Sequence, residues 1–427
     1  MSTTVATEVP RTTHAAALAL EYGDRVLLGT TRDVHRAVAS RMFRPLRLIG
    51  GRLPQAVHDT VSEAVYTGLS AALRGGGGAL RGLAGRGMGA PIEDGAGGRR
   101  LRAITNGLIG ADLHDAGDPS AITMAVRRDD RDVPVTTAAL AAAFPSPSGH
   151  LVVFLHGLVE SDESWSRETQ DARGGYPERV EDEVGASALL LRYNSGLHVS
   201  DNGVELARLV DELVEAWPVR VTRVDLVGHS MGGLVARAAT HHALAQGLAW
   251  PGLVRQVVCL GTPHLGANLE KVAHLGGQAL GLVPESAPFQ RILTTRSPGI
   301  VDLRHGYVTR DEWDGQDLTA KWGLDRRAVA PLAHADYHFV AGTLAASPWH
   351  PLSLLLGDLL VDVSSAHGRP RRGDPVVPHA TTSHVGSAGH FALLDHPQVG
   401  DWLVAWLRPR AVAALPAAPT HRPGGTS

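Results

Sequence analysis

Short apolar runs that recur along residues 151–344 constrain the fold of this chain more than any other feature of its sequence. Each run has the length of a β-strand and lacks the polar alternation of a strand with one face in water. Helix-like patterns separate the runs, and the clearest of them carries one apolar stripe before Pro218 ends it. Buried strands that alternate with helices favour an α/β fold with a mostly parallel central sheet flanked by helices. The runs lie at 151–155, 188–193, 224–227, 255–260 and 338–344.

Residues 1–100 carry a helical pattern of their own and predict an N-terminal extension ahead of the α/β domain. One helix face repeats an apolar residue every fourth position, and we expect it to pack against the main domain, although an amphipathic helix can also lie on a membrane. The glycine-rich segment 73–100 is predicted to be a flexible linker, because no strand precedes its glycine run and no Gly-Lys-Ser/Thr follows it. The repeating apolar positions are Val57, Val61, Val65, Leu69 and Leu73.

The rest of the chain is predicted to form one large domain at 101–410 and a disordered tail at 411–427. Within the domain, residues 121–128 and 132–136 have the pattern of an antiparallel hairpin. Residues 265–335 interrupt the regular alternation with several prolines and short helix-like pieces. Long insertions of this kind often cover a site, so we predict a cap or lid there.

Composition and charge exclude several classes of protein. The formal net charge is −3 and no long basic run occurs, so we expect no nucleic-acid partner. Cys259 is the single cysteine, so no intramolecular disulfide can form. The first residues lack the pattern of a signal peptide, and no apolar stretch is long enough for a transmembrane helix. We therefore expect a cytoplasmic protein, and contact with a membrane surface is left open.

The most informative motif is Gly-His-Ser-Met-Gly at 228–232, which fits the pattern G-x-S-x-G. An apolar strand ends just before it at Val227, and a helix-like run begins at Met231. A serine on a tight strand-to-helix turn presents its hydroxyl above the sheet, and glycines two residues to either side let neighbouring backbones come close. The start of the helix favours negative charge that develops beside it. Ser230, supported by Gly228 and Gly232, is therefore the predicted nucleophile.

Five segments, in chain order, carry a resemblance to a known group of enzymes. They are VVFLHGL, GHSMGGLVAR, VVCLGTPHLG, GDLLVDVSSAHG and GHFALLDHPQV, and together they span about residues 148–408. On these segments the chain resembles bacterial lipases and esterases of the α/β-hydrolase superfamily, including the group similar to GPI inositol deacylases. The resemblance implies the α/β-hydrolase fold and a catalytic triad in the chain order serine, acid, histidine.

The resemblance also implies an oxyanion hole, which is a pair of backbone N–H groups that stabilise the negative oxygen of a tetrahedral intermediate. His156 and Gly157 form the turn after the strand at 151–155, and this turn places the first donor at Leu158. The second donor is the backbone N–H of Met231. We expect His156 to hold the turn in shape rather than to transfer protons.

The remaining triad members follow from the same chain order. His390 lies on the loop after the last strand-like segment and is the predicted base, whereas His396 stands beside a proline at the start of the last helix. For the acid, Asp358 and Asp374 both remain candidates, and Asp362 is a more distant third. Asp358 is favoured because its segment matches the family pattern, while Asp374 belongs to a shorter variant of that pattern nearer to His390.

These residues predict a serine hydrolase that cleaves carboxylic esters, an esterase or lipase, through an acyl-enzyme. The same triad would serve an amidase, thioesterase or acyltransferase, and a non-catalytic binding protein on a hydrolase scaffold is a third interpretation. We expect no cofactor and no metal, since neither paired cysteines nor an H-E-x-x-H motif accompanies the histidines. The expected partner is a small-molecule or lipid ester.

Overall fold

The computed structural model describes most of the chain. The described residues are 10–22, 52–166, 171, 173–267, 297–315, 329–350 and 357–409, with isolated positions between 24 and 39. Residues 268–296 and 316–328 of the expected cap, and the whole of the expected tail, lie outside them.

A mixed eight-stranded sheet forms the centre of the molecule, in the order β2-β1-β4-β3-β5-β6-β7-β8. Strands β3 to β8 run parallel, and β1 pairs antiparallel with β4 and with β2. The predicted apolar runs are β3 to β7, which confirms the predicted fold class. The strands are β1 (Ala125–Arg128), β2 (Arg131–Val133), β3 (His150–Leu155), β4 (Ser187–Arg192), β5 (Arg223–His229), β6 (Val254–Leu260), β7 (Asp336–Thr343) and β8 (Thr381–Gly386).

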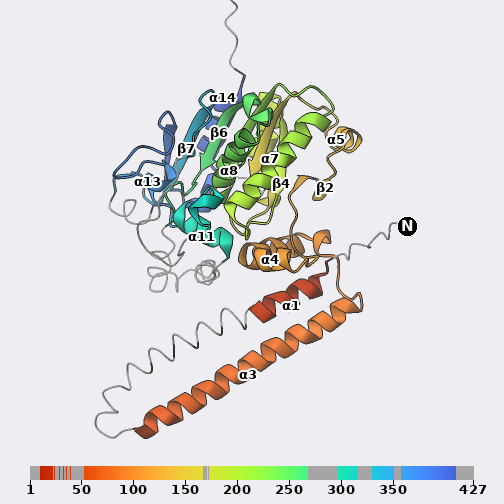
Figure 1. Ribbon diagram of the computed structural model, residues 1–427, viewed down its shortest axis with the longest axis vertical. Helices are drawn as coiled ribbons and strands as arrows, with labels where there is room; N and C mark the ends of the chain where they lie inside the picture. Colours follow the sequence, from red (N-terminus) through yellow and green to blue (C-terminus); the bar gives the residue numbers. More distant parts are fainter. Residues whose placement is uncertain are drawn as a thin grey trace, which may run out of the picture.

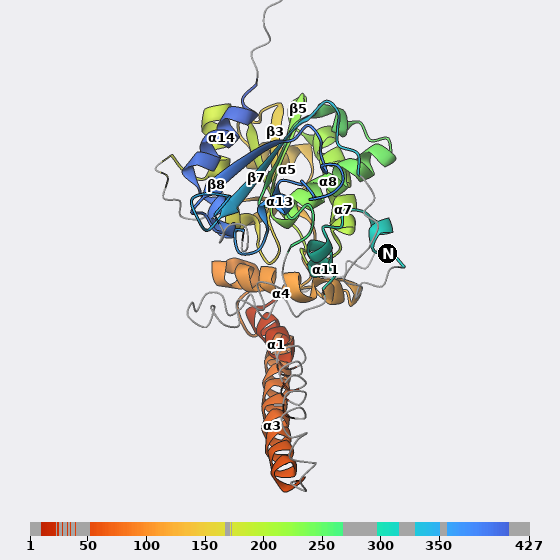
Figure 2. The same cartoon turned by 90° about the vertical axis from the view of Figure 1, so that its left-hand side faces the viewer.

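Helices cover both faces of this sheet. Figure 2 shows α14 on one side of the strands and α7 and α8 on the other. The longer helices of the domain are α7 (Val199–Ala216), α8 (Met231–Ala245) and α14 (Pro397–Leu407). Shorter helical segments are η2 (Ile92–Asp94), α5 (Thr137–Ala143), η3 (Asp162–Trp165), α6 (Tyr176–Arg179), η4 (Val180–Val184), η5 (Trp250–Leu253), α11 (Pro298–His305), η8 (Arg310–Glu312), α13 (Val363–Ala366) and η9 (His390–Leu394).

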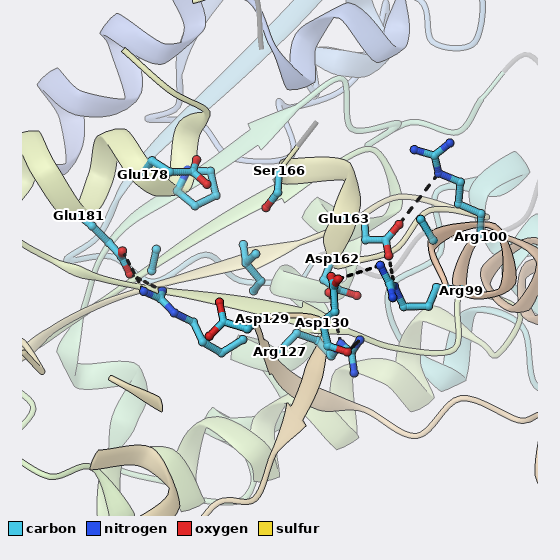
Figure 3. Close-up of a pocket in the computed structure, with 15 residues that line it drawn as sticks. Arg99, Arg100, Arg127, Asp129, Asp130, Asp162, Glu163, Ser166, Glu178 and Glu181 are labelled. Atoms are coloured by element: carbon cyan, nitrogen blue, oxygen red, sulfur yellow. Dashed lines mark hydrogen bonds and ion pairs between the residues drawn. The ribbon is translucent and has the colours of Figure 1, made fainter. Parts of the chain in front are cut away.

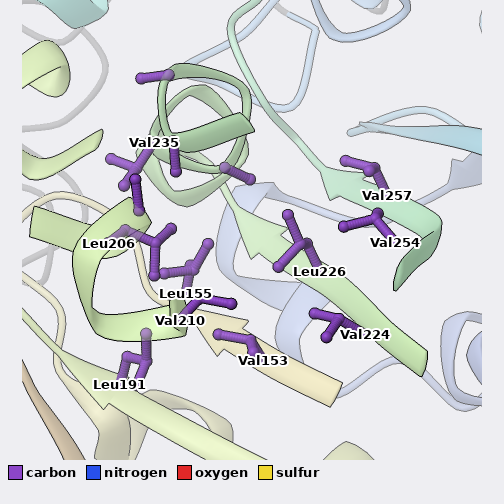
Figure 4. Close-up of a cluster of buried hydrophobic side chains, with 14 of the residues drawn as sticks. Val153, Leu155, Leu191, Leu206, Val210, Val224, Leu226, Val235, Val254 and Val257 are labelled. Atoms are coloured by element: carbon purple, nitrogen blue, oxygen red, sulfur yellow. The ribbon is translucent and has the colours of Figure 1, made fainter. Parts of the chain in front are cut away.

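The strands send alternate side chains into two separate hydrophobic layers. Val153 and Leu155 of β3 pack with α7 and α8, as do Leu226 and its neighbours (Figure 4). Val152 and Phe154 point the other way, toward the layer under α14. Because each strand is buried on both faces, its sequence is continuously apolar rather than alternating.

The N-terminal helices form an arm that projects from the body (Figures 1 and 2). Helix α1 (Thr12–Tyr22) lies along α3 (Arg52–Gly85), which is 34 residues long. The expected packing of the apolar face on the main domain is wrong, because Val61, Val65 and Leu69 remain 57%, 61% and 47% exposed. Within the described part of the chain, no helix combines the length and apolar character needed to cross a bilayer.

The predicted flexible linker at 73–100 is also corrected. Its glycine run lies inside α3, where Gly77 is buried against α1 and a Cβ there would stand 2.8 Å from Cγ of Glu21. Glycine therefore serves close helix packing here, and the helix ends only at Gly85. Sequence patterning missed this because glycine lowers helix propensity, and the contact that offsets it is tertiary.

Helix α4 (Ala96–Asp115) crosses the expected domain boundary at residue 100 and packs on the α/β domain. A Cβ at Gly107 would lie 2.5 Å from Cγ1 of Val159, in the turn after β3. The Ser297 hydroxyl donates to the Gly107 carbonyl at 3.0 Å, and the Asn194 amide donates to the Gly110 carbonyl at 2.9 Å. In both views α4 lies between the body and the arm, beside α11 (Figures 1 and 2).

Replacing Gly75 and Gly78 with alanine should stabilise α3. A Cβ at either position meets no atom within 4 Å, and glycine in a helix costs roughly 0.5–1 kcal/mol relative to alanine. We expect slower proteolytic cleavage across 73–85 in the double variant. Gly77→Ala is the matched control and should speed cleavage, because it crowds α1. Unchanged cleavage in the double variant would contradict a helical segment.

Candidate active site

Ser230 occupies a strained turn between β5 and α8. Its φ is +51° and its ψ is −118°, a conformation that non-glycine residues rarely adopt and that costs of order 1–3 kcal/mol. A side chain at Gly228 would collide with the backbone of Gly232 and Gly233. A side chain at Gly232 would collide with the carbonyl of Leu155 at the end of β3. The two glycines therefore serve the close approach that the motif predicts.

His390 and Asp358 form a buried pair at the same end of the sheet. The Nδ1 of His390 lies 2.7 Å from Oδ2 of Asp358, and the two residues are 4% and 1% exposed. The other carboxylate oxygen, Oδ1, accepts from the backbone N–H groups of Leu360 and Val361 at 3.0 and 2.8 Å. Burial lowers the pKa of His390, but the charge and hydrogen bond of Asp358 outweigh it, so the pKa lies above its ordinary value.

The structure places the histidine beside the nucleophile turn. Gly261, which follows β6, has a φ of +59°, and a Cβ there would lie 3.1 Å from Cε1 of His390. The backbone N–H of Ser230 donates to the Leu260 carbonyl at 2.8 Å, one residue before this glycine. The ring centroids of His229 and His390 are 4.8 Å apart. The sequence-predicted serine and histidine thus lie on neighbouring turns.

The other candidates for acid and base lie elsewhere. Asp374 is exposed on the loop before β8, and Asp362 is the N-cap residue of α13. His396 is the N-cap residue of α14, and its backbone N–H donates to the hydroxyl of Tyr176 at 2.8 Å. Of the acids considered from sequence, Asp358 is the one hydrogen-bonded to His390.

The two predicted oxyanion donors lie on either side of Ser230. A Cβ at Gly157 would stand 3.1 Å from Cβ of Ser230, which places the turn after β3 against the nucleophile. Among the described residues, the backbone N–H groups of Leu158 and Met231 have no hydrogen-bond partner. An oxyanion hole requires backbone donors that are free to bind the substrate oxygen, so both N–H groups remain candidates for it.

His156 fixes the turn after β3 through hydrogen bonds at both ring nitrogens. Its Nδ1 donates to the Gly157 carbonyl at 2.8 Å, and its Nε2 accepts from the Tyr193 backbone N–H at 3.2 Å. The Tyr193 ring stacks on the imidazole with centroids 4.1 Å apart. Burial lowers the pKa of His156, which agrees with a neutral ring that donates at one nitrogen and accepts at the other.

Sequence reasoning missed Glu160, a buried carboxylate in the same turn. Its Oε2 accepts from the Gly157 backbone N–H at 2.7 Å and lies 3.0 Å from Nδ1 of His229. Burial raises its pKa, but the charge and hydrogen bond of His229 outweigh burial and bring the pKa to about 2. No sequence signal singles it out, because Asp162 and Glu163 follow it in the same short segment.

A cavity of about 1180 Å³ lies apart from these residues, between β1, β4, η3 and α6 (Figure 3). Several of its charged groups pair with one another, since Arg128 lies 2.7 Å from Glu181 and Arg127 lies 3.3 Å from Asp162. None of the predicted site residues lines it. Within the described residues, no cluster of three His, Cys, Asp or Glu side chains could hold a metal ion.

The mostly parallel sheet, with its strand-to-helix serine turn and a histidine–aspartate pair at the same end, has the architecture of the α/β-hydrolase fold. Residues 202–277 match a family model described as the PGAP1-like alpha/beta domain. No curated protein matches the sequence.

Several solved structures are similar to this chain. The mature lipase BlEst2 of Bacillus licheniformis is 21% identical, with 62% of this chain and 94% of that chain covered and a TM-score of 0.40. The carboxylesterase CesB (YbfK) of Bacillus subtilis is 14% identical, with 71% and 98% covered and a TM-score of 0.34. The Pyrococcus furiosus esterase PF2001 is 16% identical, with 61% and 81% covered and a TM-score of 0.35.

Separate substitutions of the two candidate acids should give opposite results. Asp358→Asn should lower kcat by about 10⁴, because the amide no longer fixes the histidine tautomer or stabilises the imidazolium. Asp374→Asn should leave kcat unchanged, because that carboxylate is exposed. Steady-state kinetics on an activated ester checks both variants, and a loss confined to Asp374→Asn would contradict the assignment.

Proposed function

We propose that this protein is a serine hydrolase that cleaves carboxylic esters through an acyl-enzyme. Ser230 is the nucleophile, His390 the general base and acid, and Asp358 the residue that orients the histidine. The observation that carries the proposal is the buried 2.7 Å contact between His390 and Asp358 beside the strained turn of Ser230.

The chemistry follows from which nitrogen of His390 carries the proton. The contact with Asp358 holds the proton on Nδ1, so Nε2 is left with its lone pair as the base. Nε2 takes the proton of Ser230 while Oγ attacks the ester carbonyl, and the carbonyl oxygen gains negative charge. The N–H groups of Leu158 and Met231 stabilise that oxygen, and each such donor is worth about 3 kcal/mol.

The tetrahedral intermediate collapses when His390 returns the proton to the departing alkoxide. An alcohol leaves, and the acyl group remains on Ser230. Water then attacks the acyl-enzyme with His390 again as base, and the carboxylic acid is released. Asp358 stays ionised throughout and stabilises the imidazolium formed in each half of the reaction.

Apolar side chains beside the oxyanion turn support an ester with an apolar acyl group. Leu158 and Val159 pack with Ala267 and Ile300, and Leu108 of α4 joins them. A Cβ at Gly299 would lie 3.1 Å from Cε of Met231, so the start of α11 also adjoins the site. These contacts favour a lipid-like or small apolar ester over a charged substrate.

A fluorophosphonate probe should label the purified protein at Ser230. Peptide mass mapping locates the adduct, and Ser230→Ala should abolish labelling and lower kcat by at least about 10⁴. Hydrolysis of p-nitrophenyl esters of increasing acyl length should exceed that of the matching amides and thioesters. A preference for amides or thioesters would contradict ester cleavage but not the assignment of Ser230 as the nucleophile. Folded protein that takes up no label would contradict the assignment as a serine hydrolase.

The pH profile of kcat/KM should report His390. The base must be neutral, so activity falls as the pH drops through its pKa. Because the pKa of His390 is raised, we expect half-maximal activity above about pH 6.5, the ordinary value for histidine. An acid limb centred well below that pH would contradict His390 as the base.

A further inference from the structure

We propose that Glu160 and His229 form a second buried carboxylate–histidine pair, with His229 as an imidazolium, and that this pair positions the oxyanion turn, the nucleophile turn and the loop of His390 against one another. Both are positioning residues that act through their neighbours. The effect on catalysis rests on the proposed function, whereas the charge state of the pair can be tested without it.

The pair joins three loops that are far apart in the sequence. Glu160 lies after β3 and accepts the N–H of Gly157 at 2.7 Å. His229 is the last residue of β5, immediately before Ser230, and its Nδ1 lies 3.0 Å from the same carboxylate oxygen. Its Nε2 lies 3.2 Å from the main-chain carbonyl of His390, after β8. One chain of contacts therefore runs through all three catalytic loops.

Hydrogen-bond chemistry decides the charge of His229. The carbonyl oxygen of His390 can only accept, so Nε2 must carry a proton. We infer that the Glu160 carboxylate is ionised, since its Oε2 lies within hydrogen-bond distance of both the Gly157 backbone N–H and Nδ1 of His229. An ionised carboxylate only accepts, so Nδ1 then carries a proton as well. A ring that donates at both nitrogens is an imidazolium.

Burial makes this arrangement sensitive to the loss of either partner. Both side chains are buried, and the Trp165 ring lies nearly perpendicular to the His229 ring, with centroids 6.4 Å apart. A buried charge that loses its partner is costly, so the turns would shift to recover a hydrogen bond. The turn at Gly157 adjoins Leu158 and contacts Ser230, so such a shift would displace an oxyanion donor. A displacement of about 1 Å at a reacting centre can cost about 10²-fold in rate.

Another buried carboxylate–histidine pair, formed by Asp225 and His150, offers a control for stability. Asp225 and His150 lie near the starts of β5 and β3, whereas Ser230 follows the end of β5. The Nε2 of His150 lies 2.7 Å from Oδ2 of Asp225, and the aspartate is fully buried. This pair joins β3 and β5 and contacts none of the catalytic loops, and Oδ2 of Asp225 also lies 2.7 Å from Nη2 of Arg223. Asp225→Asn therefore reports what breaking a buried pair does to the fold alone.

The experiment compares Glu160→Gln with Asp225→Asn in the full chain. We expect both variants to lower the melting temperature, but only Glu160→Gln to lower kcat, by about 10²-fold and with KM little changed. Glu160→Asp keeps the charge and should recover part of that loss. An equal kcat in Glu160→Gln and in the wild type would overturn the positioning role. So would a loss of kcat in both Glu160→Gln and Asp225→Asn that is proportional to the fall in melting temperature.

Nitrogen NMR of the histidine side chains tests the charge directly, with His229 assigned by its absence in His229→Gln. We expect both ring nitrogens of His229 to be protonated at neutral pH in the wild type and one of them in Glu160→Gln. A singly protonated His229 in the wild type would overturn the imidazolium. If Glu160→Gln does not fold, Glu160→Asp should still show the doubly protonated ring. A wild type that cleaves no ester would overturn the proposed function and leave this readout intact.

Discussion

The close approach of β3 and β5 to the start of α8 is the constraint on which the rest of the site depends. Leu155 of β3 lies opposite Gly228 of β5, and Gly232 brings the first turn of α8 against the end of β3. Ser230 lies in the turn between these elements, with a φ of +51° that non-glycine residues rarely adopt. The buried sheet on both sides holds the strained turn, because relaxing it would separate strands that share two hydrophobic layers.

The charged groups of the site are buried because the turns that carry them are packed tightly. Asp358 accepts two backbone N–H groups and the His390 ring, so its carboxylate is stabilised without water. Glu160 has an equivalent environment, with one backbone donor and one imidazole. Two carboxylate–histidine pairs therefore lie within one end of the sheet, and only one of them carries the proposed base.

Much of the fold could be predicted because its signals are local. Strands buried on both faces are continuously apolar, and the serine turn needs glycines at fixed spacing, so β3, β5 and Ser230 are visible in short windows. The choice between Asp358 and Asp374 depends on which loop reaches His390, which is a tertiary contact. The glycine run of α3 was misread for the same reason, since Gly77 is explained by its contact with α1. Glu160 was missed because an acidic residue in a turn ordinarily faces water.

Helix α4 has a consequence for the order in which the chain folds. It is made before every strand of the sheet, yet some of its contacts with the α/β domain are with Asn194 and Ser297, and the bond to Ser297 spans 190 positions. Closing loops of that length is slow compared with forming a helix. We expect α4 to form early and to dock late, after the ends of the central strands are in place. The end of the sheet that carries Ser230 would then be the last part of the domain to be enclosed during synthesis.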